Sequence, residues 1–204
     1  NYAKETGSCL ILMTVNIMIN CYSRIINNSC TESTISIYDF QSIYLMQCCC
    51  INNKGETIKA QKGLDISLVD CYFLHNKATS GSGLDLSKLT SSNIIQSRFH
   101  GNIATKSGGG VYIESCDRVH IIFTILQKNQ AAFEGGGLSI SNQKISHILE
   151  TSVVIIACRF IENIADKTGA AVFLIGSKSF LLYKTNISID VVKPSSVIYM
   201  KVDN

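Results

Sequence analysis

The chain has 204 residues, of which 16% are charged and 46% apolar, and its formal net charge is +3. The charged fraction lies below the ~25% typical of soluble domains. Because the Lys and Arg residues are scattered and nucleic-acid binding needs clustered cations, we expect no nucleic-acid partner. The apolar stretch 9–19 is too short for a membrane span and contains Thr14 and Asn16, so we expect a strand there and no direct membrane span.

A short motif recurs along the chain: an apolar residue, two variable residues, Asn, and then a Gly-rich turn into another strand. Its clear copies cover 73–76, 99–102, 126–129 and 160–163, and the turns cover 81–84, 108–111, 135–138 and 169–172. Weaker copies cover 25–28, 50–53 and 183–186. The anchor residues are Asn28, Asn53, Asn76, Asn102, Asn129, Asn163 and Asn186, at steps of 23 to 34 residues. Units of this length bury an apolar face only by stacking, which predicts a solenoid.

Residues around each anchor alternate with a period of two, as in a strand with one buried face. Small residues lie five positions before the anchor, and large apolar ones lie three before it. The column between them is rich in Arg and is expected to face outward, with Arg24, Arg98 and Arg159. Helices would not tolerate the runs Gly108–Gly110 and Gly135–Gly137.

The sequence therefore predicts an all-β fold, a single-stranded right-handed parallel β-helix of seven to eight coils. We expect one domain over 1–204, and the long step from Asn129 to Asn163 predicts an insertion near 141–151. The chain begins with Asn rather than Met and shows no polar capping unit, so we expect it to be a fragment of a longer chain.

Two buried columns are predicted from this register. The anchor Asn side chains should form a hydrogen-bonded ladder at a buried bend, because an amide both donates and accepts. The large apolar positions should form an inward stack of Ile25, Phe73, Phe99, Leu126, Phe160 and Tyr183.

Nine cysteines lie at positions 9, 21, 30, 48, 49, 50, 71, 116 and 158. No paired Cys-x-x-Cys pattern is present, so zinc is not expected. Cys48 and Cys71 face inward on adjacent coils, where either a disulfide or a thiol ladder is compatible with the strand spacing. The odd count leaves at least one thiol unpaired within the chain.

We expect no catalytic residues, cofactor or metal site, because the carboxylates and the four His residues fall in different registers. Asp65 and Asp85 each follow a Leu and are expected to be solvated outward residues. Asn27 and Asn186 each begin an Asn-x-Ser sequon. Asn27 should face outward and be able to carry an N-linked glycan, whereas Asn186 should point into the ladder, where a glycan has no room.

The chain combines one motif, at 73–76, 99–102 and 160–163, with Gly-rich turns such as Gly108–Val111 and Gly169–Val172. This combination carries a family resemblance. It resembles the repeats of chlamydial polymorphic outer-membrane proteins and, more broadly, pectin-lyase-like β-helix proteins. The resemblance implies a right-handed β-helix, surface exposure and adhesion. The chain departs from that family in lacking an autotransporter barrel and in its many cysteines.

These features predict a non-enzymatic structural or adhesive segment of an extracellular or cell-surface β-helical protein. Self-association end to end into a filament, or contact with neighbouring segments of the same protein, is the expected partnership. One alternative is a surface module that binds a glycan or receptor through the Arg column or the insertion. A second alternative is a polysaccharide lyase or hydrolase.

Overall fold

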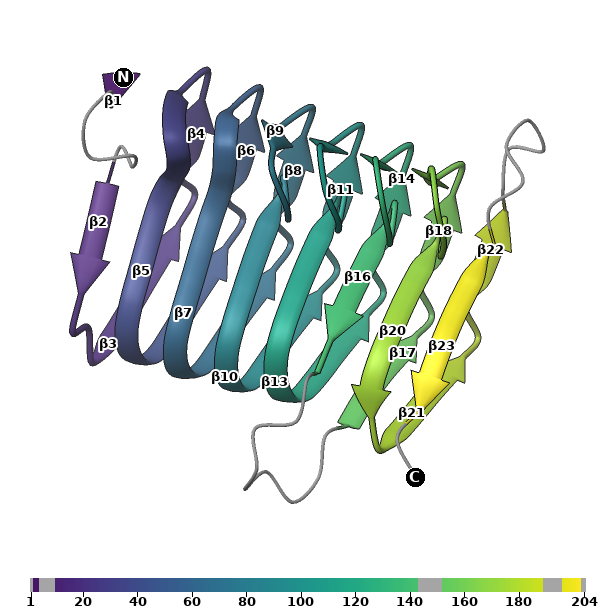
Figure 1. Ribbon diagram of the computed structural model, residues 1–204. Coiled ribbons are helices and arrows are strands. Elements are labelled where there is room, and N and C mark those ends of the chain that lie inside the picture. Colours follow the sequence, from purple (N-terminus) through teal and green to yellow (C-terminus); the bar gives the residue numbers. More distant parts are fainter. Residues whose placement is uncertain (1, 4–9, 143–151, 189–195, 203–204) are drawn as a thin grey trace.

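A computed structural model describes residues 2–3, 10–142, 152–188 and 196–202, and Figure 1 shows their strands stacked side by side as the coils of a rod. The described residues contain no helix, and their parallel strands form a β-solenoid of about seven turns. This confirms the all-β parallel β-helix predicted from the sequence.

A central coil illustrates the unit. It contains a long strand, β10 (Leu84–Ile95), a short strand on the opposite sheet, β11 (Arg98–His100), and a two-residue strand, β12 (Ile103–Ala104). Each pairs in parallel with its counterpart in the next coil, as in Leu84 with Val111 and Phe99 with Leu126. Corresponding side chains therefore stack in columns along the axis.

The strands form two sheets. The seven-stranded sheet contains β4 (Arg24–Ile26), β6 (Cys49–Ile51), β8 (Tyr72–Leu74), β11, β14 (Ile125–Gln127), β18 (Arg159–Ile161) and β22 (Asn186–Ser188). The sixteen-stranded sheet contains β1 (Tyr2–Ala3), β2 (Leu10–Met13), β3 (Ile17–Cys21), β5 (Ser29–Met46), β7 (Lys54–Val69), β9 (Lys77–Ala78), β10, β12, β13 (Val111–Ile122), β15 (Gln130–Ala131), β16 (Leu138–Ser141), β17 (Ser152–Ile156), β19 (Ile164–Ala165), β20 (Val172–Ser177), β21 (Ser179–Tyr183) and β23 (Ile198–Val202).

Left-handed residues make the corners of the coil. Among the described residues, seventeen other than glycine have positive φ, and they fall into three aligned columns. The columns are Thr14, Asp39, Lys62, Lys88 and Ser115; Tyr22, Gln47, Asp70, Gln96, Phe123, Ala157 and Lys184; and Asn27, Asn52, His75, Lys128 and Glu162. Such a conformation is uncommon for these residue types. It persists because the corner N–H groups still bond to the next coil, as from Gln96 N to Ile122 O at 2.9 Å.

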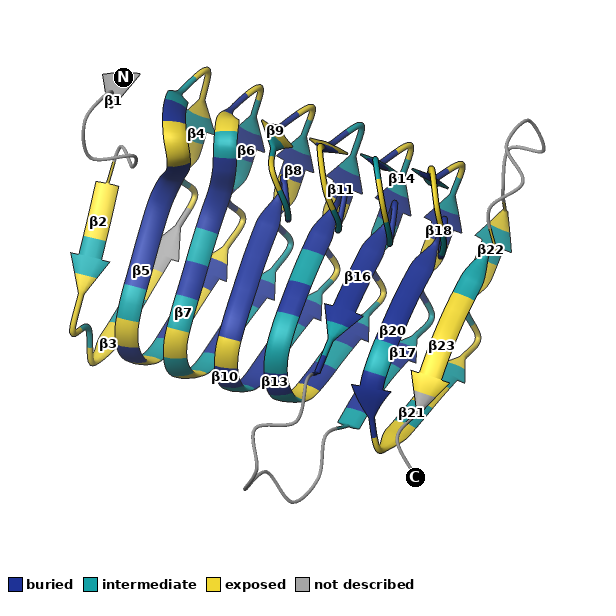
Figure 2. Cartoon of the chain, viewed as in Figure 1, coloured by how far each residue is buried: buried dark blue, intermediate teal, exposed yellow. Residues whose placement is uncertain are grey.

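The core is a continuous column of side chains between the two sheets, and Figure 2 colours the buried residues of the strands dark blue. Phe73 and Phe99 are fully buried and stack with ring centroids 4.8 Å apart and an interplanar angle of 1°. Leu126 and Phe160 continue the same column and are also fully buried. Ile25 begins it and is half-buried.

The last coil differs from the predicted register. Arg159 pairs with Asn186 and Phe160 with Ile187, so Asn186 lies on the outward column and Ile187 takes the inward position expected for Tyr183. Tyr183 pairs with Ile156 and is 51% exposed. The cause is the corner at Lys184, which fixes the phase of the residues after it. The sequence motif 183–186 is out of phase with that corner, and Asn186 lies outside the ladder.

The predicted insertion near 141–151 lies mostly outside the described residues. Its size still follows from the register on either side. Glu114 and Arg118 are four residues apart, whereas their partners Ser141 and Ser152 are eleven apart. This coil therefore carries seven additional residues between β16 and β17.

Candidate functional site

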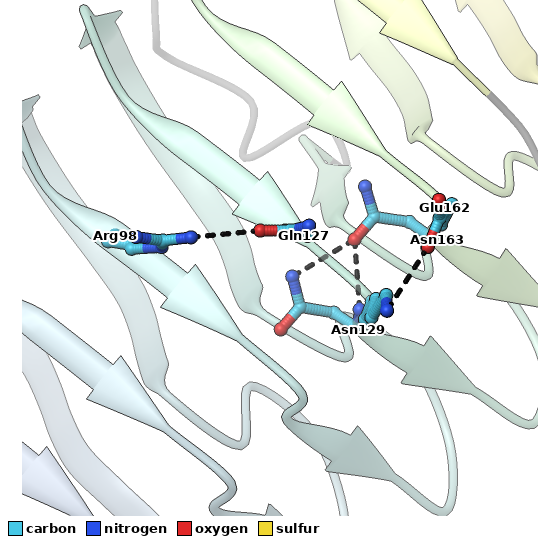
Figure 3. Close-up of polar contacts among 6 residues, drawn as sticks. Arg98, Gln127, Asn129, Glu162 and Asn163 are labelled. Carbon is cyan, nitrogen blue, oxygen red and sulfur yellow. Dashed lines mark hydrogen bonds and ion pairs between the residues drawn. The ribbon is translucent and has the colours of Figure 1, made fainter.

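The most regular polar feature is a ladder of six asparagines, from Asn28 to Asn163, at the bend after the short sheet. In each step the backbone N–H and the side-chain Nδ2 of one Asn donate to the Oδ1 of the Asn in the next coil. For Asn76 and Asn102 both distances are 3.0 Å. Figure 3 shows the same arrangement for Asn129 and Asn163, where both distances are also 3.0 Å.

The second Nδ2 proton points the other way along the axis. It reaches the backbone carbonyl of the large apolar residue one coil earlier, as from Asn102 Nδ2 to Phe73 O at 2.9 Å. A ladder Asn such as Asn102 thus uses both amide protons and accepts two bonds on Oδ1, which saturates its side chain. Asn53, Asn76, Asn102, Asn129 and Asn163 are buried, so this saturation removes the penalty of burying an amide.

A second ladder of small hydroxyls and thiols follows the middle corner. The column contains Ser23, Cys48, Cys71, Ser97, Thr124, Cys158 and Thr185. Ser97 Oγ accepts from Cys71 N at 3.1 Å and donates to Ile95 O at 2.9 Å. Cys71 Sγ lies 3.4 Å from the carbonyl oxygens of Leu45 and Val69. Cysteine and serine therefore occupy equivalent positions in this column.

The thiols of Cys48 and Cys71 are not joined by a disulfide and are hydrogen-bonded to each other. This bond lowers the pKa of Cys48 and, together with burial, raises the pKa of Cys71. The sequence is compatible with either a disulfide or a thiol ladder at Cys48 and Cys71, and the structure has the thiol ladder. Cys30, by contrast, is disulfide-bonded. Burial also raises the pKa of Cys116 to about 12 and that of Cys158 to about 11.

The outward column of the short sheet contains the predicted Arg residues. Arg24, Arg98 and Arg159 are exposed, and they are separated by Cys49, Tyr72 and Ile125 in the intervening coils. Arg98 donates to Gln127 Oε1 at 3.0 Å (Figure 3). The structure does not bring the three guanidinium groups together in neighbouring coils.

A groove of about 530 Å³ lies over this column and the adjacent corner. Its lining residues are Tyr22, Arg24, Ile26, Gln47, Cys49, Ile51 and Tyr72. Tyr22 is 76% exposed and Tyr72 is 40% exposed. The side chains of Gln47 and Tyr72 both form hydrogen bonds with Asp70 beside the groove. The groove therefore combines two accessible aromatic rings, an apolar floor and one cation.

The carboxylates differ from the sequence expectation at one position. Asp85 pairs with Lys59 and Tyr112, is 7% exposed and is not solvated. The Gly-rich turn lies on its outer side, so close that a Cβ on Gly81 would be 2.9 Å from Asp85 Cβ. Burial raises the pKa of Asp85 to about 7, Lys59 lowers it, and Glu56 and Glu114 raise it.

Asp65 pairs instead with Ser91 and is half-buried, so it is not the equivalent of Asp85. His75 and His100 lie in a T-shaped pair with ring centroids 5.2 Å apart, and both come from neighbouring coils. Sequence reasoning had placed the four His residues in different registers and missed this contact. Within the described part of the chain, no group of three His, Cys, Asp or Glu side chains is arranged to hold a metal ion.

No family model matches the chain, and no curated protein matches it significantly. In the part of the chain that the structure describes, no helix is long and apolar enough to span a membrane. The solenoid is compatible with the resemblance drawn from the repeat motifs.

We predict that Asn102→Ala lowers the free energy of unfolding by about 3 kcal/mol or more. The substitution leaves Asn76 N–H, Asn76 Nδ2 and Phe73 O without their buried partners, and each such loss costs about 1–3 kcal/mol. Asn186→Ala is the matched control and should change stability by less than about 0.5 kcal/mol, as exposed substitutions usually do. Equilibrium urea denaturation measures both, and a larger cost at Asn186 than at Asn102 would contradict the assigned register.

We also predict that Asp85 makes the protein less stable as the pH rises. Because the folded-state pKa is raised to about 7 from an ordinary 3.8, the folded state favours the protonated form. Stability is therefore lost as the pH rises from about 4 to about 7, and it changes little above that range. Asp85→Asn should stabilise the protein by about 2–4 kcal/mol at pH 8 and hardly at all at pH 4. Urea denaturation at several pH values across this range gives the free energy of unfolding of the unmodified protein and of Asp85→Asn. If that free energy falls with pH as steeply in Asp85→Asn as in the unmodified protein, the prediction is refuted.

Proposed function

We propose that the chain is a non-enzymatic structural segment of an extracellular β-helical protein, with outer faces available for adhesion. The asparagine ladder is the observation that carries the proposal. Buried amides that could form a polar site bond instead from coil to coil, and they hold the short sheet in register from Asn28 to Asn163. Such an arrangement supports a rigid rod whose length is set by the number of coils.

An extracellular location is supported by one covalent feature and one resemblance. Cys30 is disulfide-bonded, and disulfides persist chiefly in oxidising compartments. Five cysteines that form no disulfide are buried, pack as small apolar residues and are shielded from oxidants: Cys48, Cys50, Cys71, Cys116 and Cys158. The resemblance to chlamydial surface-protein repeats points to the same location and to adhesion.

The location is tested with antibodies against the chain on intact and permeabilised cells of its source. We expect labelling of intact cells at the level seen after permeabilisation, with a cytoplasmic marker labelled only in permeabilised cells. Labelling of the chain that appears only after permeabilisation would refute the extracellular assignment.

A second candidate function is glycan or receptor binding, and the groove around Tyr72 favours it. Exposed tyrosine rings provide apolar faces with a polar tip, a composition common in binding surfaces. Arg24 is a charged lining residue of the groove, so an anionic ligand is favoured.

Calorimetric titration with neutral and uronate oligosaccharides tests this candidate. We expect Tyr72→Ala and Arg24→Ala each to weaken uronate binding at least tenfold, because each removes a groove contact. Arg159→Ala is the matched control, since it lies on the same outward column outside the groove. Absence of binding, or equal loss in all three variants, would exclude the groove as the site.

A further inference from the structure

The structure places the acceptor side chains of both Asn-x-Ser sequons on the outside of the coil. Asn27 is the left-handed residue at the corner that follows β4, and it is exposed. Asn186 begins β22, pairs with Arg159 on the outward column of the short sheet, and is also exposed. This reverses the expectation for Asn186, which the repeat motif had placed in the buried ladder.

Both acceptors lie on the side of the rod, where a stacked coil does not cover them. Tyr72 and Arg98 belong to the same outward column as Asn186, have a described coil on either side, and are still exposed. His75 holds the corner position of Asn27 in an interior coil and is exposed as well. Further coils at either end would therefore leave Asn27 and Asn186 accessible from the side.

The side-chain amides of the two acceptors are not used by the fold. Within the described part of the chain, neither Asn27 nor Asn186 forms a hydrogen bond through its side chain. A ladder residue differs, because Asn102 Nδ2 uses one proton on Phe73 O and the other on Asn129 Oδ1. A glycosidic bond replaces one Nδ2 proton, so a glycan on Asn102 would break the buried ladder, whereas a glycan on Asn186 breaks no bond.

The sequence keeps sequons away from the ladder. The residues two positions after the six ladder asparagines are Cys30, Gly55, Ala78, Ala104, Ala131 and Ala165, none of which is Ser or Thr. The four alanines stack as a column of small side chains on β9, β12, β15 and β19. Asn102-Ile-Ala and Asn186-Ile-Ser differ only in the third residue. The sequons therefore coincide with the outward asparagines alone.

We propose that Asn27 and Asn186 are acceptors of N-linked oligosaccharides, an inference that rests on the extracellular location in the proposed function. The donor is an oligosaccharide carried on a lipid diphosphate. A bond forms between Asn Nδ2 and the anomeric carbon of the first sugar, and the bond from that carbon to the diphosphate oxygen breaks. The lipid diphosphate leaves, and Nδ2 gives up one proton to solvent. Ser29 and Ser188 supply the hydroxyl that a sequon requires.

Secretion from cultured animal cells tests the two acceptors. The full chain is expressed behind a secretion signal, and the product is treated with an amidase that releases N-linked glycans and converts each modified Asn to Asp. Peptide mass spectrometry then identifies the modified positions. We expect modification at Asn27 and Asn186 in the unmodified protein, loss at Asn186 alone in Ser188→Ala, and loss at Asn27 alone in Ser29→Ala.

Ala104→Ser is the matched control, because it creates the tripeptide Asn102-Ile-Ser inside the ladder. We expect it to be glycosylated before it folds and to be secreted at least tenfold less than the unmodified protein, since the modified amide cannot complete the ladder. The same variant made in the bacterial cytoplasm, without glycosylation, should give the circular dichroism spectrum of the unmodified protein. If it does not fold there, Ala131→Ser, which creates Asn129-Gln-Ser, replaces it.

Secreted, folded protein without a glycan at either acceptor would overturn the proposal, and so would efficient secretion of Ala104→Ser with a glycan on Asn102. Glycopeptide analysis of the protein from its source separates this proposal from the proposed location. Unmodified acceptors in protein that antibodies label on intact cells would overturn the glycan proposal and leave the location standing. Labelling only after permeabilisation would instead refute the location, on which glycosylation in the source depends.

Discussion

Polar groups at a buried bend need partners, and in a solenoid the only direction that supplies them at every coil is the axis. The asparagine ladder meets this constraint, because each amide accepts two bonds from the coil before it and donates to the coils on both sides. A buried amide left unbonded would cost several kcal/mol, whereas a saturated one fixes the register of its neighbours. The flat stacking of Phe73 on Phe99 depends on that same register.

The corners impose a second constraint, on the phase with which side chains alternate between the inward and outward faces. A single left-handed residue turns the chain while its N–H still bonds to the next coil, so no loop interrupts the hydrogen bonding. Each corner then determines which following residues face inward. In each coil, the member of the hydroxyl and thiol ladder lies one residue after the middle corner. Only a small side chain that can hydrogen-bond to nearby carbonyl groups fits there. This explains why Cys71 and Cys158 share a column with Ser97 and Thr124.

The sequence predicted the coil, the Gly-rich turns and six of the seven anchor positions because alternation and Asn spacing report directly on burial. It failed at Asn186 because an apolar residue and an Asn three positions later occur there out of phase with the corner at Lys184. That corner has no strong sequence signal, since Lys, Gln, Ala and Phe all occupy the same left-handed column. Asp85 was misjudged for a different reason. Alternation does place it on the outward side of its strand, but the Gly-rich turn covers that side, and strand periodicity carries no information about such a cover.

The most direct test of the ladder is native-state hydrogen exchange resolved by residue. The backbone N–H groups of Asn53, Asn76, Asn102 and Asn129 each donate to the Oδ1 of the next ladder residue. If the ladder holds the coils in register, these four amides exchange only through global unfolding, and Asn102→Ala speeds exchange at Asn76 more than at Asn129. Exchange of the four amides through local opening, far faster than the amides of the buried strands, would contradict this account of the fold.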